Sequence, residues 1–299
     1  MSAIFKGLSA FPITPSDANG TVDTDTLQTL VTRLAGASVN SIGLLGSTGT
    51  YAYLDRDERQ SAVIAAAEVK GNTPLIVGIG ALRTDMAVRL AEDAQAAGAD
   101  GLLLAPVSYT PLTQEEAFVH FRTVAGATDL PLCVYNNPGT THFSFGQDLL
   151  RRLAALPNIS AVKMPLPAKG TIADDLAQLR AVLPSDFVIG YSGDWGVAEA
   201  MQAGADAFYS ALGGTIPHMF LKLVATATSG DTAATAALNN RIAPLWEICR
   251  KSGSLRLAYA LAARLGLSRS PLPLPLLPLD EPALAQLDLW LSENHDLAH

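Results

Sequence analysis

Short apolar runs alternate with longer amphipathic segments along the first two thirds of the chain, and this alternation constrains the fold most strongly. Eight such runs recur at intervals of about 27 residues, the length of one βα unit. Seven of the eight are almost wholly apolar, as expected of parallel strands buried on both faces. Eight βα units close into a barrel, so the pattern predicts an α/β fold of the (β/α)8 type, the TIM barrel. The predicted strands are Gly7–Phe11, Ser41–Leu45, Pro74–Ile79, Gly101–Leu104, Pro131–Tyr135, Ile159–Lys163, Phe187–Gly190 and Ala207–Ser210.

The segments between these runs carry apolar residues at helical spacing. Two of them open with a capping residue, Asp55 or Thr113, followed by acidic side chains that favour a helix N-terminus. The spacing predicts helices over Thr26–Ala35, Asp55–Glu68, Asp85–Ala97, Gln114–Val124 and Gln147–Leu156.

A weak internal repeat supports the barrel. Ala97–Asp100 and Ala203–Asp206 have the same sequence, Ala-Gly-Ala-Asp, and each precedes a predicted strand. In both, the glycine is expected to end a helix and turn the chain into the strand. An open, doubly wound sheet is the alternative, although the Gly-x-Gly-x-x-Gly turn of its dinucleotide-binding form does not follow the first strand.

The pattern changes after Ser210, where the spacing predicts helices and no further strands. Four prolines within Ser270–Pro278 forbid a regular helix there. We therefore predict a catalytic barrel over residues 1–215 and a C-terminal helical domain over residues 216–299. The predicted helices are Ile216–Thr228, Thr232–Lys251, Ser254–Leu265 and one from Glu281 to about Ser292.

Composition argues against several classes of protein. Asp and Glu outnumber Lys and Arg by 28 to 20 without basic clusters, so we expect no binding to nucleic acid or to anionic membranes. No apolar stretch reaches the roughly 20 residues of a spanning helix, and the N-terminus lacks a signal-peptide pattern. Two cysteines, Cys133 and Cys249, fit a reducing compartment, so we expect a cytoplasmic protein. The five histidines show no metal-ligand spacing, and no metal site is predicted.

Lys163 carries the strongest chemical signal. It is one of only six lysines and ends a predicted core strand, so its amine points into the mouth of the barrel, where this fold places active sites. Desolvation disfavours the charged form of such an amine, and a neutral amine is a nucleophile toward ketones. The alternative is a lysine that extends from a strand end into solvent.

Two further features lie at the same predicted end of the barrel. Tyr135 ends the neighbouring strand, and its phenol could move protons to and from an adduct on Lys163; a core tyrosine is the alternative. The turn Gly46–Gly49 offers the hydroxyls of Ser47 and Thr48 together with backbone amides, which can hold a carboxylate without an arginine. An ordinary turn whose hydroxyl caps the next helix is the alternative.

Taken in order, these residues resemble the dihydrodipicolinate synthase / N-acetylneuraminate lyase family of class I aldolases. The matching motifs are Phe11–Pro15, Gly46–Gly49, Tyr135–Pro138, Lys163 and Gly193–Asp194, and the match extends over nearly the whole chain. The resemblance implies a barrel with a C-terminal helical domain, assembled as a homotetramer. It implies neither a metal nor an organic cofactor, because a lysine of the enzyme forms an imine with pyruvate or another 2-oxo acid.

By position in this resemblance, Lys163 matches the Schiff-base lysine and Tyr135 the tyrosine that shuttles protons. Ser47 and Thr48 match the hydroxyl pair that holds the carboxylate of the 2-oxo acid. The other residues expected around the substrate are Tyr109, Thr140, Gly193, Asp194 and Tyr209.

Three positions depart from the family pattern. Thr140 stands where the synthases carry an arginine that anchors the second carboxylate of aspartate semialdehyde, and a neutral hydroxyl cannot replace that clamp. Ser108 stands where they carry a tyrosine of an inter-subunit proton relay, with Tyr109 next to it as a possible substitute. Thr50 stands where the family often has glutamate.

The sequence thus predicts a Schiff-base lyase or aldolase that joins pyruvate to an aldehyde, or cleaves a 2-oxo-3-deoxy acid, through an imine on Lys163. Three alternatives stay open. A dehydratase could use the same imine, and a 4-hydroxy-tetrahydrodipicolinate synthase is disfavoured by Thr140. The third, from a different class, is a non-catalytic barrel that binds a small acid.

Overall fold

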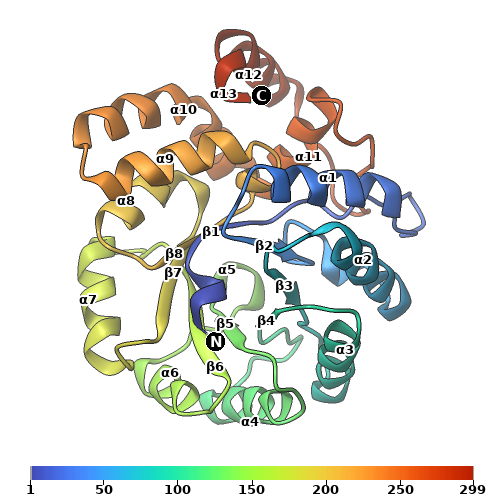
Figure 1. The fold of residues 1–299 in the computed structure, drawn as a ribbon, viewed down its shortest axis with the longest axis vertical. Helices are drawn as coiled ribbons and strands as arrows, with labels where there is room; N and C mark the ends of the chain where they lie inside the picture. Colours follow the sequence, from blue (N-terminus) through green and yellow to red (C-terminus); the bar gives the residue numbers. More distant parts are fainter. Residues whose placement is uncertain (1, 299) are drawn as a thin grey trace.

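The computed structural model describes residues 2–298 as a closed barrel of eight parallel strands in sequential order. Figure 1 shows the strands at the centre of the barrel and the helices around them, which confirms the predicted fold. Two strands run further than predicted, because Met164–Pro165 and Tyr191–Ser192 continue the pairing between β6 and β7. The strands are β1 (Gly7–Ala10), β2 (Ser41–Leu44), β3 (Leu75–Gly78), β4 (Gly101–Leu104), β5 (Leu132–Tyr135), β6 (Ile159–Pro165), β7 (Val188–Ser192) and β8 (Ala207–Ser210).

The five predicted helices between the strands form with small shifts at their ends, and three more, α5, α7 and α8, are present. Both expected caps are present. The Asp55 carboxylate accepts from the Glu58 N–H, and Thr113 forms a reciprocal capping box with Glu116. The helices around the barrel are α1 (Thr24–Gly36), α2 (Arg56–Val69), α3 (Thr84–Ala96), α4 (Gln114–Ala125), α5 (Pro138–Thr141), α6 (Gln147–Ala154), α7 (Ile172–Val182) and α8 (Val197–Gln202).

The repeated Ala-Gly-Ala-Asp sequence has a structural role beyond the turn. Gly98 and Gly204 adopt positive φ angles of 92° and 87°, as the end of a helix before a strand requires. The aspartates that follow, Asp100 and Asp206, accept hydrogen bonds from backbone N–H groups at the start of the preceding strand, each at 2.8 Å. The side chain of Asn40 does the same for β1. These side chains therefore tie neighbouring strands together at the N-terminal end of the barrel.

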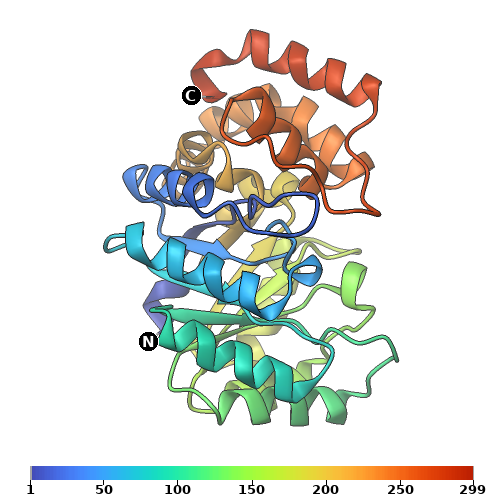
Figure 2. The ribbon, with the colours of Figure 1, turned by 90° about the vertical axis from the view of Figure 1, so that its right-hand side faces the viewer.

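The C-terminal helices stack on one side of the barrel, as Figure 2 shows. The first, α9, follows β8 and packs against α8 and β1, so it occupies the position of the eighth barrel helix (Figure 1). The predicted boundary at residue 215 stays a prediction. The Pro-rich stretch forms no helix, as expected. The helices are α9 (Pro217–Ser229), α10 (Thr232–Ser252), α11 (Ser254–Arg264), α12 (Glu281–Glu293) and α13 (His295–Ala298).

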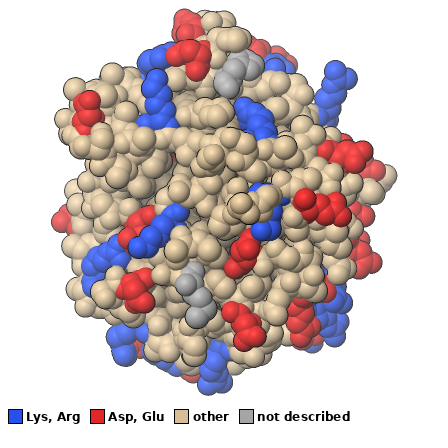
Figure 3. All heavy atoms as spheres, viewed as in Figure 1, with Lys and Arg blue, Asp and Glu red and all other residues tan. Residues whose placement is uncertain are grey.

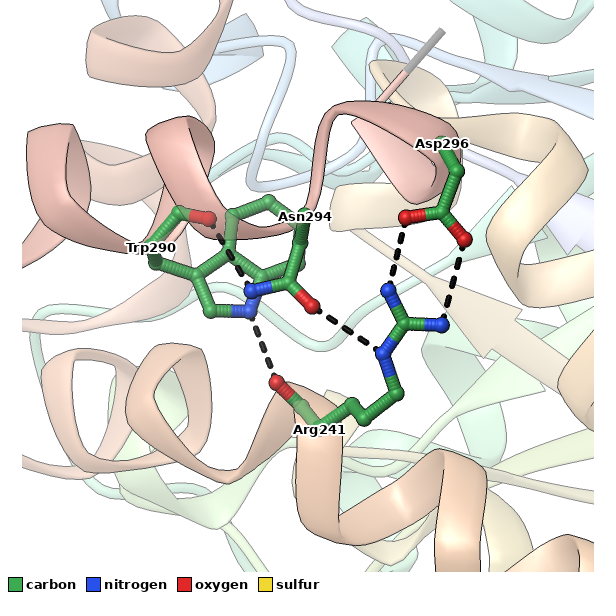
Figure 4. A network of polar contacts seen from close by, with 4 residues as sticks. All are labelled: Arg241, Trp290, Asn294 and Asp296. Carbon is green, nitrogen blue, oxygen red and sulfur yellow. Dashed lines mark hydrogen bonds and ion pairs between the residues drawn. The ribbon is translucent and has the colours of Figure 1, made fainter.

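A polar network fastens the end of the chain to α10 (Figure 4). The Arg241 guanidinium donates to both carboxylate oxygens of Asp296 and to the side-chain oxygen of Asn294. The indole N–H of Trp290 donates to the Arg241 carbonyl at 2.8 Å. Because Trp290 is also buried, this junction combines apolar packing with satisfied polar groups.

The face seen in Figure 3 carries acidic and basic side chains interspersed over the barrel helices and the C-terminal helices. Within residues 2–298, no helix is long and apolar enough to cross a membrane. The expectations about nucleic acid and cytoplasmic location stay predictions.

Asp206→Ala tests the role of the strand ties. The substitution leaves the Ile189 N–H without its side-chain acceptor and removes the ion-pair partner of Arg180, which should lower the free energy of unfolding by about 1–3 kcal/mol. The melting temperature reports this loss. The matched control is Asp186→Ala, which removes an exposed aspartate just before β7, the strand that contains Ile189. Equal melting temperatures for the two variants would contradict the role.

Candidate active site

Lys163 lies near the C-terminal end of β6, and strand pairing sets it directly opposite Tyr135 on β5. Its side chain is only 5% exposed. The amine Nζ lies 4.1 Å from the ring centroids of Phe11 and Tyr135 and 5.6 Å from that of Tyr209. Among residues 2–298, Lys163 forms no ion pair with an acidic side chain. The lysine is therefore enclosed by aromatic faces and does not extend into solvent.

The Tyr135 hydroxyl has two side-chain neighbours that hold it in place. The amide Nδ2 of Asn137 donates to the phenolic oxygen at 2.9 Å. Ser47 Oγ lies 3.5 Å from the same oxygen, at the limit of a hydrogen bond. These two contacts fix the position of the phenolic oxygen, and a proton-transferring group needs such a fixed position.

The turn after β2 is held in a strained conformation by close packing. Leu45 and Thr50, on either side of Gly46–Gly49, have positive φ angles of 54° and 51°, which cost an L-residue about 1–2 kcal/mol each. A Cβ on Gly46 would lie 2.5 Å from the Phe11 ring, so only glycine fits against that ring. The turn is thereby fixed beside the aromatic enclosure of Lys163.

This turn presents donors for an anion. Within residues 2–298, the backbone N–H groups of Ser47 and Thr48 meet no protein acceptor. Ser47 also reaches Tyr135, so the turn and the lysine face one another across the same barrel mouth. Unpaired N–H groups together with two hydroxyls are suited to binding a carboxylate.

Asp194 lies beyond β7 and is 1% exposed. It accepts hydrogen bonds from the Ser210 hydroxyl and from the Leu212 N–H. Burial raises the pKa of the Asp194 carboxyl above its ordinary value of 3.8, although these hydrogen bonds and the charge of Lys163 oppose the rise. Gly193, just before it, has a φ of 110°, a conformation that favours glycine. Asp194 therefore joins the loop after β7 to the loop after β8.

The structure does not gather all of the predicted substrate residues around the amine. Tyr109 is 97% exposed, and Thr140 is exposed and donates to the Asn137 carbonyl. Tyr209 forms a wall beneath the amine, and its hydroxyl meets Cys133 Sγ inside the barrel at 3.5 Å. Burial raises the pKa of the Tyr209 phenol well above its ordinary value and that of the Cys133 thiol to about 12.

Sequence reasoning missed several residues that shape this site. Phe11 and Asn137 both belong to motifs that the sequence singled out, but as neighbours of the expected groups rather than as members of the site. Tyr51 and Arg59 were missed entirely. The one available signal for Arg59 was its position on the buried face of a predicted helix, where arginine is unusual. Within the described chain, no group of three or more His, Cys, Asp or Glu side chains could hold a metal ion.

A (β/α)8 barrel with a buried lysine at its mouth fits a class I lyase, the class of enzyme that works through an imine on a lysine. A model of the dihydrodipicolinate synthetase family matches residues 4–294. The chain belongs to this family.

Individual relatives agree with this assignment. A 4-hydroxy-tetrahydrodipicolinate synthase of Bacillus velezensis is 32% identical and covers 96% of this chain and 98% of its own. One of Pseudomonas aeruginosa is 37% identical over 78% of this chain and 79% of its own. The crystal structure of a dihydrodipicolinate synthase from Agrobacterium tumefaciens is 53% identical, with a TM-score of 0.95 over 97% of this chain and 98% of that one.

Asp194→Asn tests the buried charge. The pKa of Asp194 is higher in the folded than in the unfolded state, so the folded protein binds this proton more tightly. The contribution of Asp194 to wild-type stability therefore falls as the pH rises above 3.8, the ordinary pKa of the carboxyl. The amide is isosteric and uncharged. We therefore expect the melting temperature of the variant, relative to wild type, to be higher at pH 8 than at pH 5.

The matched control is Asp186→Asn, which changes an exposed aspartate and should show no such trend. A variant that is less stable at pH 8 than at pH 5, relative to wild type, would show that the site stabilises the charged carboxylate.

Proposed function

We propose that the amine of Lys163 forms an imine with pyruvate, and that the enzyme then makes or cleaves a carbon–carbon bond between pyruvate and an aldehyde. The observation that carries this proposal is the enclosure of the Lys163 amine between the Phe11 and Tyr135 rings. Tyr135 is also the residue that pairs with Lys163 in the register of β5 and β6. A synthase of the family from Acinetobacter baumannii, 30% identical to this chain, has a crystal structure complexed with pyruvate, which supports the choice of 2-oxo acid.

Each residue in the proposal has one task. Ser47 and Thr48 hold the pyruvate carboxylate, which aims the ketone at the amine. Lys163 attacks the carbonyl carbon, and the resulting carbinolamine loses water to give the iminium. Tyr135 supplies the proton that leaves with that water and takes one from the methyl carbon, which leaves an enamine. The enamine adds to the aldehyde, and the reverse sequence cleaves a 2-oxo-3-deoxy acid.

The acceptor aldehyde is proposed to lack a second carboxylate. The segment Pro138–Thr141 carries no arginine or lysine, and Thr140 offers only a neutral hydroxyl. A single hydroxyl cannot make the paired, charge-assisted hydrogen bonds that anchor a carboxylate. The names of the relatives favour a second candidate, synthesis of 4-hydroxy-tetrahydrodipicolinate, which requires aspartate semialdehyde as the acceptor.

The enzyme is also proposed to assemble as a homotetramer, as the family resemblance implies. Tyr109 and Leu82 are 97% and 69% exposed, and both lie on loops at the C-terminal end of the barrel. A second copy of the chain would remove these apolar side chains from water.

Gly193, Asp194 and Tyr209 are proposed to shape the floor and wall of the pocket beneath the substrate.

Borohydride reduction with pyruvate tests the proposal. The reduced imine should add a pyruvyl mass to the peptide that contains Lys163, because reduction makes the carbon–nitrogen bond permanent. Lys163→Ala should lose both the adduct and turnover while keeping its fold, and Lys169→Ala, an exposed lysine six residues on, should lose neither. An unmodified Lys163 peptide with pyruvate and with other 2-oxo acids would overturn the proposal.

A further inference from the structure

A second phenol, Tyr51, lies behind Tyr135 and has no part in the steps above. It begins the short 3₁₀ helix η2 (Tyr51–Tyr53), directly after the turn proposed to hold the carboxylate. Tyr51 and Tyr135 line one cavity, whose free space of about 10 Å³ is close to that of a single water molecule. The cavity lies between the ends of β2, β3 and β4, and neither Asn137 nor Ser47, the two side chains that contact the Tyr135 hydroxyl, lines it.

Gly80 leaves the space that the Tyr51 hydroxyl occupies. A Cβ added to Gly80 would lie 3.0 Å from Tyr51 Oη and 3.3 Å from a methyl group of Val107. Any larger residue at Gly80 would therefore push the hydroxyl away from its present place. The absence of a side chain there lets the phenol reach the cavity.

A buried cation supports the other face of Tyr51. The Arg59 guanidinium lies 5.2 Å from the Tyr51 ring centroid and donates to the carbonyls of Gly78 and Gly80. Arg59 is 7% exposed, and within residues 2–298 it pairs with no carboxylate. A buried charge without a counter-ion is costly, so its retention needs an explanation beyond the two carbonyls.

The electrostatics of the two phenols and the arginine are coupled. Burial and, to a smaller extent, negative charge on Tyr135 raise the pKa of Tyr51 to about 12, and the Arg59 cation opposes this rise. Burial lowers the pKa of Arg59 to about 10, and Tyr51 opposes that change. Tyr51 thus responds to the charge on Tyr135, and Arg59 is placed to stabilise a phenolate on Tyr51.

We propose that Tyr51 is the outer member of a proton relay, linked to Tyr135 by one water molecule and positioned by Arg59 and Gly80. This inference rests on the proposed imine chemistry. When Tyr135 gives its proton to the departing hydroxyl of the carbinolamine, the bridging water protonates Tyr135 and takes the Tyr51 proton. Tyr51 is then a phenolate beside the Arg59 cation. When the methyl carbon of the iminium releases a proton to the relay, these transfers run in reverse and every phenol regains its proton.

The exchange of pyruvate methyl protons in D2O isolates this step, because it needs the imine and proton transfer but no aldehyde. We expect Tyr51→Phe to slow the exchange by about 10–100-fold, below the full effect of a general acid–base group. The equilibrium fraction of Lys163 trapped by borohydride at saturating pyruvate should stay unchanged. Gly80→Ala, which keeps the phenol but displaces its hydroxyl, should slow exchange in the same direction.

Tyr53→Phe is the matched control, since this tyrosine belongs to the same 3₁₀ helix and is 43% exposed; its exchange rate should equal that of wild type. If Tyr51→Phe exchanged the pyruvate methyl protons at a rate within twofold of that of Tyr53→Phe, the relay would be overturned. A parallel loss of exchange and of the trapped adduct would also overturn it, because Tyr51 would then support only the shape of the site. A wild-type protein that forms no adduct at all would overturn the proposed function instead.

Discussion

The register between β5 and β6 places Tyr135 opposite Lys163, and the chemistry of this barrel depends on that pairing. Parallel strands of a closed sheet cannot slip by one residue without moving every inward side chain outward. The two neighbouring pairs, Val134 with Val162 and Cys133 with Ala161, are fully buried and resist such a slip. The hydrophobic core of the barrel therefore fixes the distance between the amine and the phenol.

Space for the rings around the amine comes from missing side chains. A Cβ on Gly43 would lie 2.2 Å from the Phe11 ring, and one on Gly190 would lie 2.6 Å from the Tyr209 ring. Gly190 is also the register partner of Lys163 on β7. A third glycine, Gly78, passes so close to the Leu45 carbonyl that no side chain would fit. Small residues on the strands thus allow aromatic faces to enclose the lysine.

Periodicity predicted the barrel because each strand is apolar on both faces and each helix has one buried face. The position of Lys163 at a strand end then predicted a buried amine, which the structure shows. Sequence could not place Tyr51 at the same cavity as Tyr135, since that arrangement depends on a strained turn and on the space beside Gly80. It also could not show that Tyr109 faces solvent in a single chain, because loop direction is set by tertiary packing.

A crystal structure of the protein grown with pyruvate tests the central claim most directly. The account predicts continuous density from Lys163 Nζ to the second carbon of pyruvate. It also predicts that the pyruvate carboxylate lies within hydrogen-bonding distance of the Ser47 and Thr48 N–H groups, with the Tyr135 hydroxyl beside the adduct. Pyruvate bound elsewhere, or bound at the turn with Lys163 unmodified and turned away from it, would contradict the account.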